Sequence, residues 1–267
     1  MQPSIDSTKP NAARIYDFLL GGKDHFAVDR ETASQLIRAW PATTTTAREN
    51  RAFLGRAVRY LVAEAGVRQF LDIGTGLPSA NNVHEVAQQV APECRVVYVD
   101  NDPVVMAHAR ALLTSSPEGR TAYIQADLRD PARILQDPAT RAVLDLGQPV
   151  ALMLLAIVHF ITDEEKPCQL VSTLMDALPP GSYLALSHVT GDFYWKEATE
   201  AEIMGTWHQS GVTMCPRTAE RISAIALDGL EPVSPGLVSV SEWRPDSADP
   251  PPPPAEVNLY GAVARKP

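Results

Sequence analysis

The fold is decided by the segment Val67-Arg68-Gln69-Phe70-Leu71-Asp72-Ile73-Gly74-Thr75-Gly76-Leu77-Pro78. A short apolar run ends in an acid and a Gly-x-Gly turn, and valines then recur at helical spacing over residues 83–90. This order predicts a strand over 69–73, a tight turn and a helix, the first unit of a nucleotide-binding α/β sheet. Gly74 and Gly76 would let the backbone bend sharply and expose bare peptide to a ligand, although a tight turn alone would also explain them.

A second segment favours the interpretation of that turn as a ligand site. Residues 95–99 form a buried-type strand that ends in Asp100, Asn101 and Asp102. Asp100 follows Gly74 by 26 residues (100 − 74), near the ~20 expected of a carboxylate that holds ribose hydroxyls. Asp102 is predicted to cap the next helix, and Pro103 suits its first turn because no backbone donor is lost there.

Composition narrows the classes of function. The 267 residues, 45% of them hydrophobic, suit one large α/β domain or a domain with an appendage. A net charge of −9 disfavours a nucleic-acid partner. The cysteines (Cys94, Cys168 and Cys215) lack zinc-site spacing, so we expect no metal site and free thiols in a reducing cytoplasm. We see no signal peptide, and the longest apolar run, 150–158, is shorter than the ~20 residues that cross a bilayer, so no membrane partner is expected.

The first 66 residues predict a helical extension before the sheet. Asn11 is expected to cap a helix that ends at Gly21–Gly22, and Asp29 to start a second helix. The Thr43–Thr46 run is expected to be a loop, followed by a third helix over 48–65.

From residue 69 onward, strands alternate with helical patterns. Strands are predicted over 69–73, 95–99, 121–125, 149–157 and 183–187, which implies a parallel sheet with right-handed crossovers. After a helix from Thr218 to Leu227, strands over 236–242 and 257–264 follow without a helix between them, giving seven strands with a terminal antiparallel hairpin. Their connection contains Pro250–Pro254, which we interpret as an extended excursion rather than a ligand for a proline-reading domain.

The motifs together resemble a known family. Residues 70–78 resemble the first motif of class I methyltransferases, residues 97–103 the second and residues 126–129 the third. With Tyr-Asp-Phe-Leu-Leu-Gly-Gly-Lys-Asp at 16–24 and Arg-Glu-Asn-Arg-Ala-Phe at 48–53, nearly the whole chain resembles a bacterial S-adenosylmethionine-dependent methyltransferase family first catalogued as a domain of unknown function.

The resemblance implies an α/β fold with a class I methyltransferase-like Rossmann sheet and S-adenosyl-L-methionine as cofactor. It divides the chain into 1–66, a helical extension or lid packed on the core, and 67–267, the cofactor-binding domain. Pro78 stands where the common pattern has a further glycine, which disfavours a dinucleotide more than a cofactor without pyrophosphate. Methyl transfer to a small-molecule acceptor is our first hypothesis; a non-catalytic S-adenosylmethionine-binding sensor and, less favoured, an NAD-dependent oxidoreductase are the alternatives.

The resemblance also implies roles for residues after the second and third strands. Asp100 would accept hydrogen bonds from both ribose hydroxyls, unless it only caps a helix. Asn101 would lie beside the adenine or the ribose. Asp127 would accept a hydrogen bond from the adenine amino group, unless it is the N-cap before Pro131, and the Leu128 backbone would contact the ring edge.

The glycine turn and the end of the fourth strand would complete the cofactor site. Asp72 would orient the turn or meet the cofactor's ammonium group through water. Thr75 lies in the turn between the two glycines. Ala156 and Ile157 would line the pocket.

Catalytic candidates are fewer, because methyl transfer depends mainly on positioning and desolvation. His159 follows the fourth strand and would act as a general base or only shape the pocket wall, and His188 occupies a similar place after the fifth. Tyr16 would face the sulfonium by a cation–π contact if the extension is a lid. Asp24, flanked by Lys23 and His25, belongs to that lid or to an ordinary packing extension.

The insertion after the fifth strand carries aromatic residues. Tyr194, Trp195 and Trp207 would shape an acceptor pocket or, as we favour, pack in the core.

Overall fold

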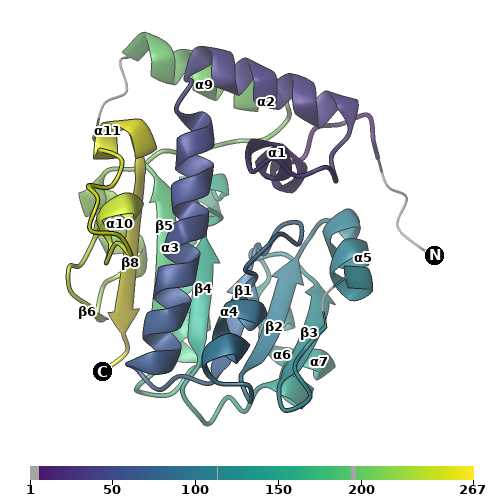
Figure 1. Cartoon of the computed structure of the whole chain (residues 1–267), viewed down its shortest axis with the longest axis vertical. Coiled ribbons are helices and arrows are strands. Elements are labelled where there is room, and N and C mark those ends of the chain that lie inside the picture. The colour runs from purple at the N-terminus through teal and green to yellow at the C-terminus, as the bar shows by residue number, and fades with distance from the viewer. Residues whose placement is uncertain (1–5, 113, 194–196) are drawn as a thin grey trace.

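A computed structural model of the chain describes residues 6–112, 114–193 and 197–267 (Figure 1). Within them lies one mixed sheet with the strand order β3-β2-β1-β4-β5-β8-β6. The parallel strands are β1 (Gln69–Ile73), β2 (Arg95–Asp100), β3 (Arg120–Gln125), β4 (Ala151–Leu155) and β5 (Tyr183–Val189). β8 (Leu259–Arg265) pairs antiparallel with β5 and with the short strands β6 (Glu231–Pro232) and β7 (Val238–Ser239).

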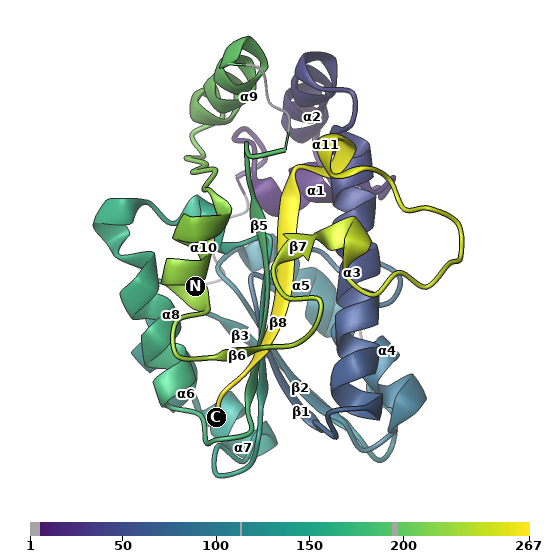
Figure 2. The same cartoon turned by 90° about the vertical axis from the view of Figure 1, so that its left-hand side faces the viewer.

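Helices cover both faces of the sheet (Figure 2). One face carries α3 (Thr43–Ala63) and α4 (Val83–Val90); the other carries α6 (Pro131–Gln136), α7 (Pro138–Val143), α8 (Pro167–Asp176) and α10 (Ala219–Ala226). α5 (Pro103–Leu112) packs beside β2 and β3. Above the sheet lie α1 (Ala12–Leu19), α2 (Ala27–Ala39) and α9 (Glu197–Gln209). Short turns of helix occur at α11 (Pro254–Val257), Val158–Phe160, Asp163–Glu165 and Val240–Glu242.

The sheet separates two hydrophobic cores, and β1 contributes to both. Every residue of β1 is buried. Phe70 packs on the α3 side with Phe53, whereas Leu71 and Ile73 pack on the other side with Leu174 of α8. A strand buried on both faces is what a continuous apolar run predicts for the centre of a parallel sheet.

A third cluster forms a cap at the carboxyl ends of the strands. Ile15 of α1 and Leu36 of α2 pack with Ile203 and Trp207 of α9, although α9 follows α2 by more than 150 residues in the chain. α3, in contrast, packs on the sheet itself. The N-terminal extension therefore supplies one helix to the body and two to the cap.

Two local predictions for the extension are wrong, whereas its first helix cap is confirmed. The Asn11 side chain accepts hydrogen bonds from the amides of the first turn of α1. Thr43–Thr46 is not a loop but the first turn of α3, where the Thr46 hydroxyl donates to the Val257 carbonyl at 2.8 Å. Asp29 does not start α2: the helix begins at Ala27, and the buried Asp29 carboxylate accepts from the Phe26 amide and Arg14 Nε.

The C-terminal hairpin is shorter than predicted. Only Val238–Ser239 of the 236–242 run pairs as a strand, because the chain turns into a short helix at Val240. The edge strand Glu231–Pro232 was not predicted. Residues 250–253 carry no regular structure, and the Ser241 hydroxyl donates to the Pro252 carbonyl at 2.8 Å.

The three cysteines are unpaired, as predicted. Across the described ranges, no helix has the length and apolarity needed to cross a bilayer.

The close packing of β8 against α3 leaves no room for a side chain at Gly261. A Cβ there would lie 2.7 Å from Val240 Cγ1 and 3.0 Å from Phe53 Cζ. We expect Gly261→Ala to lower the free energy of unfolding by about 1–3 kcal/mol through overpacking. Gly205 lies within α9, where a Cβ meets nothing within 4 Å, so Gly205→Ala should raise that free energy by about 0.5–1 kcal/mol. Urea unfolding of both variants checks this, and equal effects would contradict it.

Candidate functional site

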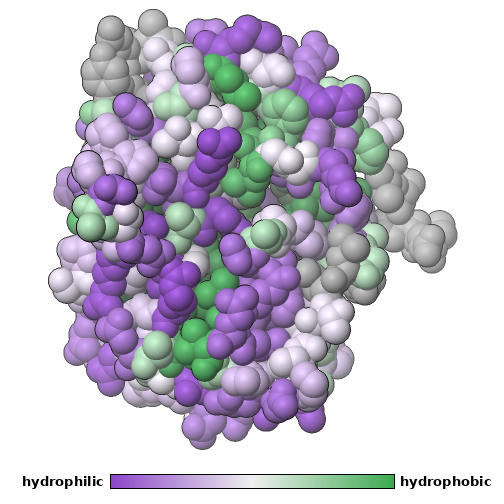
Figure 3. All heavy atoms as spheres, in the orientation of Figure 1, coloured by the Kyte–Doolittle hydropathy of each residue, from purple (hydrophilic) through white to green (hydrophobic). Residues whose placement is uncertain are grey.

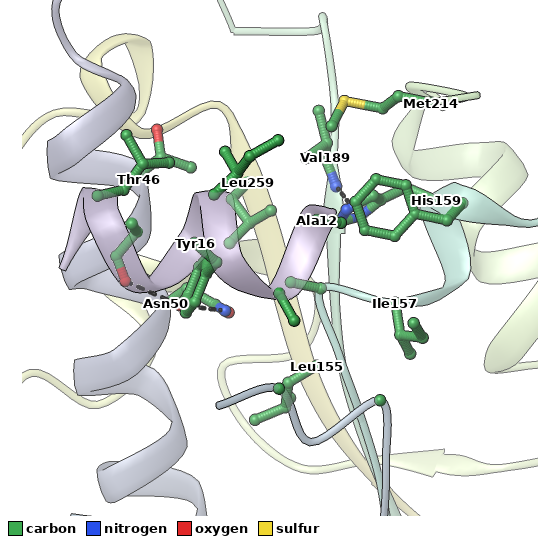
Figure 4. A pocket seen from close by; sticks show the side chains of 18 of the residues that line it. Ala12, Tyr16, Thr46, Asn50, Leu155, Ile157, His159, Val189, Met214 and Leu259 are labelled. Carbon is green, nitrogen blue, oxygen red and sulfur yellow. Dashed lines mark hydrogen bonds between the residues drawn. The ribbon is translucent and has the colours of Figure 1, made fainter. Parts of the chain in front are cut away.

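A cavity lies where the carboxyl ends of the parallel strands meet the cap (Figure 4). Its floor comes from the loops after β1, β2 and β4, and its far walls come from α1, α2 and α9. Figure 3 shows apolar residues on the upper half of the molecule, over the place where α1 and α3 lie in Figure 1, and a second group on the lower half. Ligands of open α/β sheets bind at this edge.

The glycine turn borders the cavity with bare peptide. Gly74 has a φ of +76°, and a Cβ on it would lie 2.6 Å from Ile157 Cγ1, so only glycine fits there. Gly76 has a φ of +67°, and a Cβ on it would meet nothing within 4 Å. The space beside Gly76 is therefore open to a ligand.

Asp100 lies directly against that turn at the end of β2. Its Oδ2 accepts a hydrogen bond from the Gly76 amide at 2.9 Å, and its Oδ1 accepts one from the Asp102 amide at 2.9 Å. Burial raises the pKa of Asp100 to about 6. Each oxygen keeps lone pairs for a further donor, such as a ribose hydroxyl.

Asp72 supplies a second buried carboxylate to the same end of the cavity. Its Oδ2 accepts from the Thr75 hydroxyl at 3.1 Å. Burial raises the pKa of Asp72 to about 7, because little compensates the loss of water around the charge. Two adjacent carboxylates of raised pKa form an environment that favours a cationic ligand.

Arg51 of α3 also lines this end of the cavity, and no role was predicted for Arg51 from the sequence. Its Nε and Nη2 donate to the Ala80 carbonyl at 3.2 and 3.0 Å, and Nη2 also donates to Asn82 Oδ1 at 3.0 Å. Arg51 therefore ties α3 to the loop after the glycine turn. Among the described residues, Arg51 Nη1 has no hydrogen-bond acceptor. The fixed positive charge of Arg51 lowers the pKa of Asp72 against the effect of burial.

Asn101 and Asp127, which follow β2 and β3, lie together. The Asn101 Nδ2 donates to Asp127 Oδ2 at 2.8 Å, and the Arg129 amide donates to Asp127 Oδ1 at 2.9 Å. Although burial opposes it, these hydrogen bonds hold the pKa of Asp127 below its ordinary value. Asn101 lines the cavity; Asp127 and Leu128 do not, and the Leu128 side chain is in the core.

Asp127 is also not the N-cap of the helix that contains Pro131. That role belongs to Asp130, whose Oδ1 accepts from the Arg133 amide at 3.1 Å.

A chain of hydrogen bonds connects the end of β4 to the cap. The Ala156 amide donates to Ser187 Oγ at 2.9 Å, and Ser187 Oγ donates to Asn50 Oδ1 at 2.6 Å. The Asn50 Nδ2 then donates to the Tyr16 hydroxyl at 3.0 Å, and that hydroxyl donates to the Ala47 carbonyl (Figure 4). Ala156 is held at a φ of +53°, a conformation rare outside glycine.

His159 lines the cavity at the start of the segment after β4. Its Nδ1 lies 3.4 Å from the Val189 amide and accepts that hydrogen, so the neutral ring carries its proton on Nε2 (Figure 4). Burial lowers the pKa of His159 well below its ordinary value. His188 lies outside the cavity lining and contacts Arg217 through Nε2.

The structure does not bring Asp24 to the cavity. Its Oδ2 lies 3.7 Å from His108 Nδ1 on α5, and its amide donates to Asp17 Oδ2, which also contacts His25 Nδ1 at 3.0 Å. Lys23 is exposed. Tyr16 and Trp207 line the cavity, whereas Tyr194 and Trp195 lie outside the described residues.

The sheet order, the antiparallel last strand and the acid-bordered glycine turn define a class I methyltransferase. The family model of S-adenosyl methyltransferases matches residues 1–267, and the chain belongs to this family. The protein is therefore an S-adenosylmethionine-dependent methyltransferase with S-adenosylmethionine as its cofactor, which decides against the NAD alternative. A comparison with curated proteins found no match.

Solved structures agree with this assignment. The chain is 47% identical to a DUF574-family protein from Streptomyces avermitilis, over 99% of this chain and 100% of that one, with a TM-score of 0.95. It is 41% identical to a candidate methyltransferase from Thermobifida fusca, over 99% and 97%, with a TM-score of 0.90. An S-adenosylmethionine-dependent methyltransferase from Anabaena variabilis, 15% identical over 99% and 100% with a TM-score of 0.52, shares the fold.

The raised pKa of Asp72 makes a prediction about stability. The ordinary pKa of Asp72 is 3.8, and its pKa in the folded chain is about 7. Between these two pH values, Asp72 holds a proton in the folded chain that it has released in the unfolded chain. The stability of the ligand-free protein therefore falls as pH rises through that interval. Above about pH 7, the protein bears the full free-energy cost of burying the ionised Asp72 carboxylate. We expect Asp72→Asn to raise the free energy of unfolding by at least about 1 kcal/mol near pH 8, with little effect near pH 4.

Urea unfolding across this pH range checks the expectation. Asp228→Asn is the matched control, because Asp228 is an exposed acid away from the cavity. A gain for Asp72→Asn that does not depend on pH would contradict the explanation.

Proposed function

We propose that this methyltransferase transfers its methyl group to a small-molecule acceptor held between the glycine turn and the cap. The observation that carries the proposal is that a single cavity extends from Gly76 and Asp100 at the strand ends to Ile203 and Trp207 in the cap. When bound, S-adenosylmethionine supplies a methyl carbon on a cationic sulfur, and transfer to an acceptor lone pair leaves that sulfur as a neutral thioether. The chain's own part is to bind, orient and exclude water.

The Asp100 carboxylate would hold the ribose. Its two oxygens are fixed by the Gly76 and Asp102 amides, so their free lone pairs have set directions. Charge-assisted hydrogen bonds to two vicinal hydroxyls would place the nucleoside against the bare peptide of Gly76. Asn101, which lines the cavity, would contact the adenine or the ribose, and Asp127, which lies outside the lining, would act only by holding the Asn101 amide.

Arg51 and Asp72 would bind the amino-acid end of the cofactor. Both line the cavity on the α3 side of the glycine turn, beside Thr75. A guanidinium suits a carboxylate and an ionised Asp72 suits an ammonium group, directly or through water. The two charges are thus arranged for a zwitterionic group.

Tyr16 and His159 would position the reacting groups rather than move protons. The Tyr16 hydroxyl donates to a backbone carbonyl, and burial raises its pKa, so it stays a neutral phenol whose ring can face a sulfonium. Because His159 Nδ1 accepts from a backbone amide, its Nε2–H is a donor and not a base. Asp24, which lies outside the cavity, has no part in this proposal.

Two ligands separate the proposed subsites. S-adenosylhomocysteine carries the amino-acid end, whereas 5′-methylthioadenosine lacks it. We expect Arg51→Ala to raise the Kd of S-adenosylhomocysteine at least about tenfold and to leave that of 5′-methylthioadenosine within about twofold. Asp100→Asn should weaken both ligands by about tenfold or more, because both contain the ribose. Calorimetry measures each Kd. If Arg51→Ala weakened the binding of both ligands equally, the assignment of Arg51 to the amino-acid end of the cofactor would be wrong.

Turnover itself distinguishes an enzyme from a binding protein. Methyl-labelled S-adenosylmethionine is incubated with the protein and a small-molecule extract of bacterial cells, and labelled products are sought by mass spectrometry. We expect labelled product with the native chain and at least a tenfold loss with Asp100→Asn. Cofactor binding without any labelled product across extracts would favour the sensor.

A further inference from the structure

The part of the cavity beyond the cofactor end carries no ionised side chain. Among the described lining residues, the charged ones are Arg51, Asp72 and Asp100, all at the glycine-turn end. His159 also lines the cavity, but burial keeps its pKa low and its ring neutral. The cap supplies mainly apolar side chains, including Leu36, Ile203 and Trp207. An ionised acceptor group placed here would lose its water without gaining a counter-charge from these side chains.

One polar side chain in this lining has no partner. Asn258 is 1% exposed, and neither its Oδ1 nor its Nδ2 has a hydrogen-bond partner within the described chain. Its backbone, in contrast, is fully engaged: its amide donates to the Pro254 carbonyl at 2.9 Å, and its carbonyl accepts from the Thr190 amide at 3.0 Å. Asn258 is one of the residues that line the cavity, together with Leu259 and Thr46 (Figure 4 labels the latter two).

The backbone conformation does not account for this carboxamide. Asn258 follows α11 with a φ of +46°, where asparagine is tolerated but glycine is the less strained residue. A buried amide with a free donor and a free acceptor costs free energy that a glycine would not. Such a group is accounted for when a ligand satisfies it.

We propose that Asn258 is the polar anchor of the acceptor subsite and selects a neutral, largely apolar small molecule whose polar group both donates and accepts hydrogen bonds. This inference rests on the proposed function and adds the chemical class of the acceptor. The apolar walls bind the body of the molecule, and the carboxamide pairs with its polar group. Anionic and cationic relatives of the same shape are rejected by desolvation.

A matched pair of probes tests the selection. Naphthalene-2-carboxamide and naphthalene-2-carboxylate have nearly the same shape, but only the second is charged. Each is titrated by calorimetry into the full chain, alone and saturated with S-adenosylhomocysteine. We expect the carboxamide to bind at least about tenfold more tightly than the carboxylate. Equal affinity, a preference for the carboxylate, or no binding of either probe overturns the proposal.

Variants of Asn258 locate the effect. Asn258→Gly removes the carboxamide and suits the positive φ; we expect it to weaken the carboxamide probe about tenfold, to leave the Kd of S-adenosylhomocysteine within about twofold and not to lower the melting temperature. Asn258→Asp keeps the shape but removes the donor and should weaken the probe in the same direction. Asn81→Gly is the control, since Asn81 also has a positive φ, of +63°, but is exposed outside the cavity.

The outcomes separate this inference from the proposed function. If S-adenosylhomocysteine does not bind, the proposed function fails, and the probes are compared on the ligand-free chain. If S-adenosylhomocysteine binds but Asn258→Gly leaves the affinity of the carboxamide probe unchanged, only the anchor fails.

Discussion

The hydrogen bond from the Gly76 amide to the Asp100 carboxylate holds the site together. It joins the turn after β1 to the end of β2 across 24 positions of sequence, and it places open peptide beside an anionic side chain. The turn can approach that strand end because Gly74 takes a positive φ beneath Ile157. The parallel order of β2, β1 and β4 brings the remaining loops to the same edge. The bond fixes the Gly76 amide relative to the Asp100 carboxylate, the two parts of the proposed cofactor site.

Electrostatics divide the cavity into two regions. At the glycine-turn end, burial raises the pKa of both Asp72 and Asp100, so the ligand-free protein carries a destabilising pair of acids that a cationic cofactor would relieve. Beneath the cap, the described lining is uncharged, and the polar groups of Tyr16 and Asn50 are engaged with each other. This division fits a charged cofactor that meets a neutral acceptor.

The sequence predicted the sheet and the strand ends that border the cavity, because buried strands are continuous apolar runs and the Gly74–Gly76 turn and Asp100 lie at the ends of two of them. Contacts between distant segments escaped prediction. Thr46 begins a helix rather than a loop because its hydroxyl reaches a carbonyl 211 positions away, and Asn50 meets Ser187 across 137 positions. Nothing in local sequence marks Asn258 as a buried, unpartnered amide, nor shows that the Asp24 loop turns towards α5. The roles of the site residues stay predictions.

The central claim is that the glycine turn and Asp100 bind the nucleoside of the cofactor as one unit. A crystal structure of the protein with S-adenosylhomocysteine tests it most directly. The account predicts both ribose hydroxyls within hydrogen-bonding distance of the Asp100 carboxylate and the thioether sulfur facing the cap. A nucleoside bound elsewhere, or an Asp100 side chain turned away from both the ribose and the Gly76 amide, would contradict it.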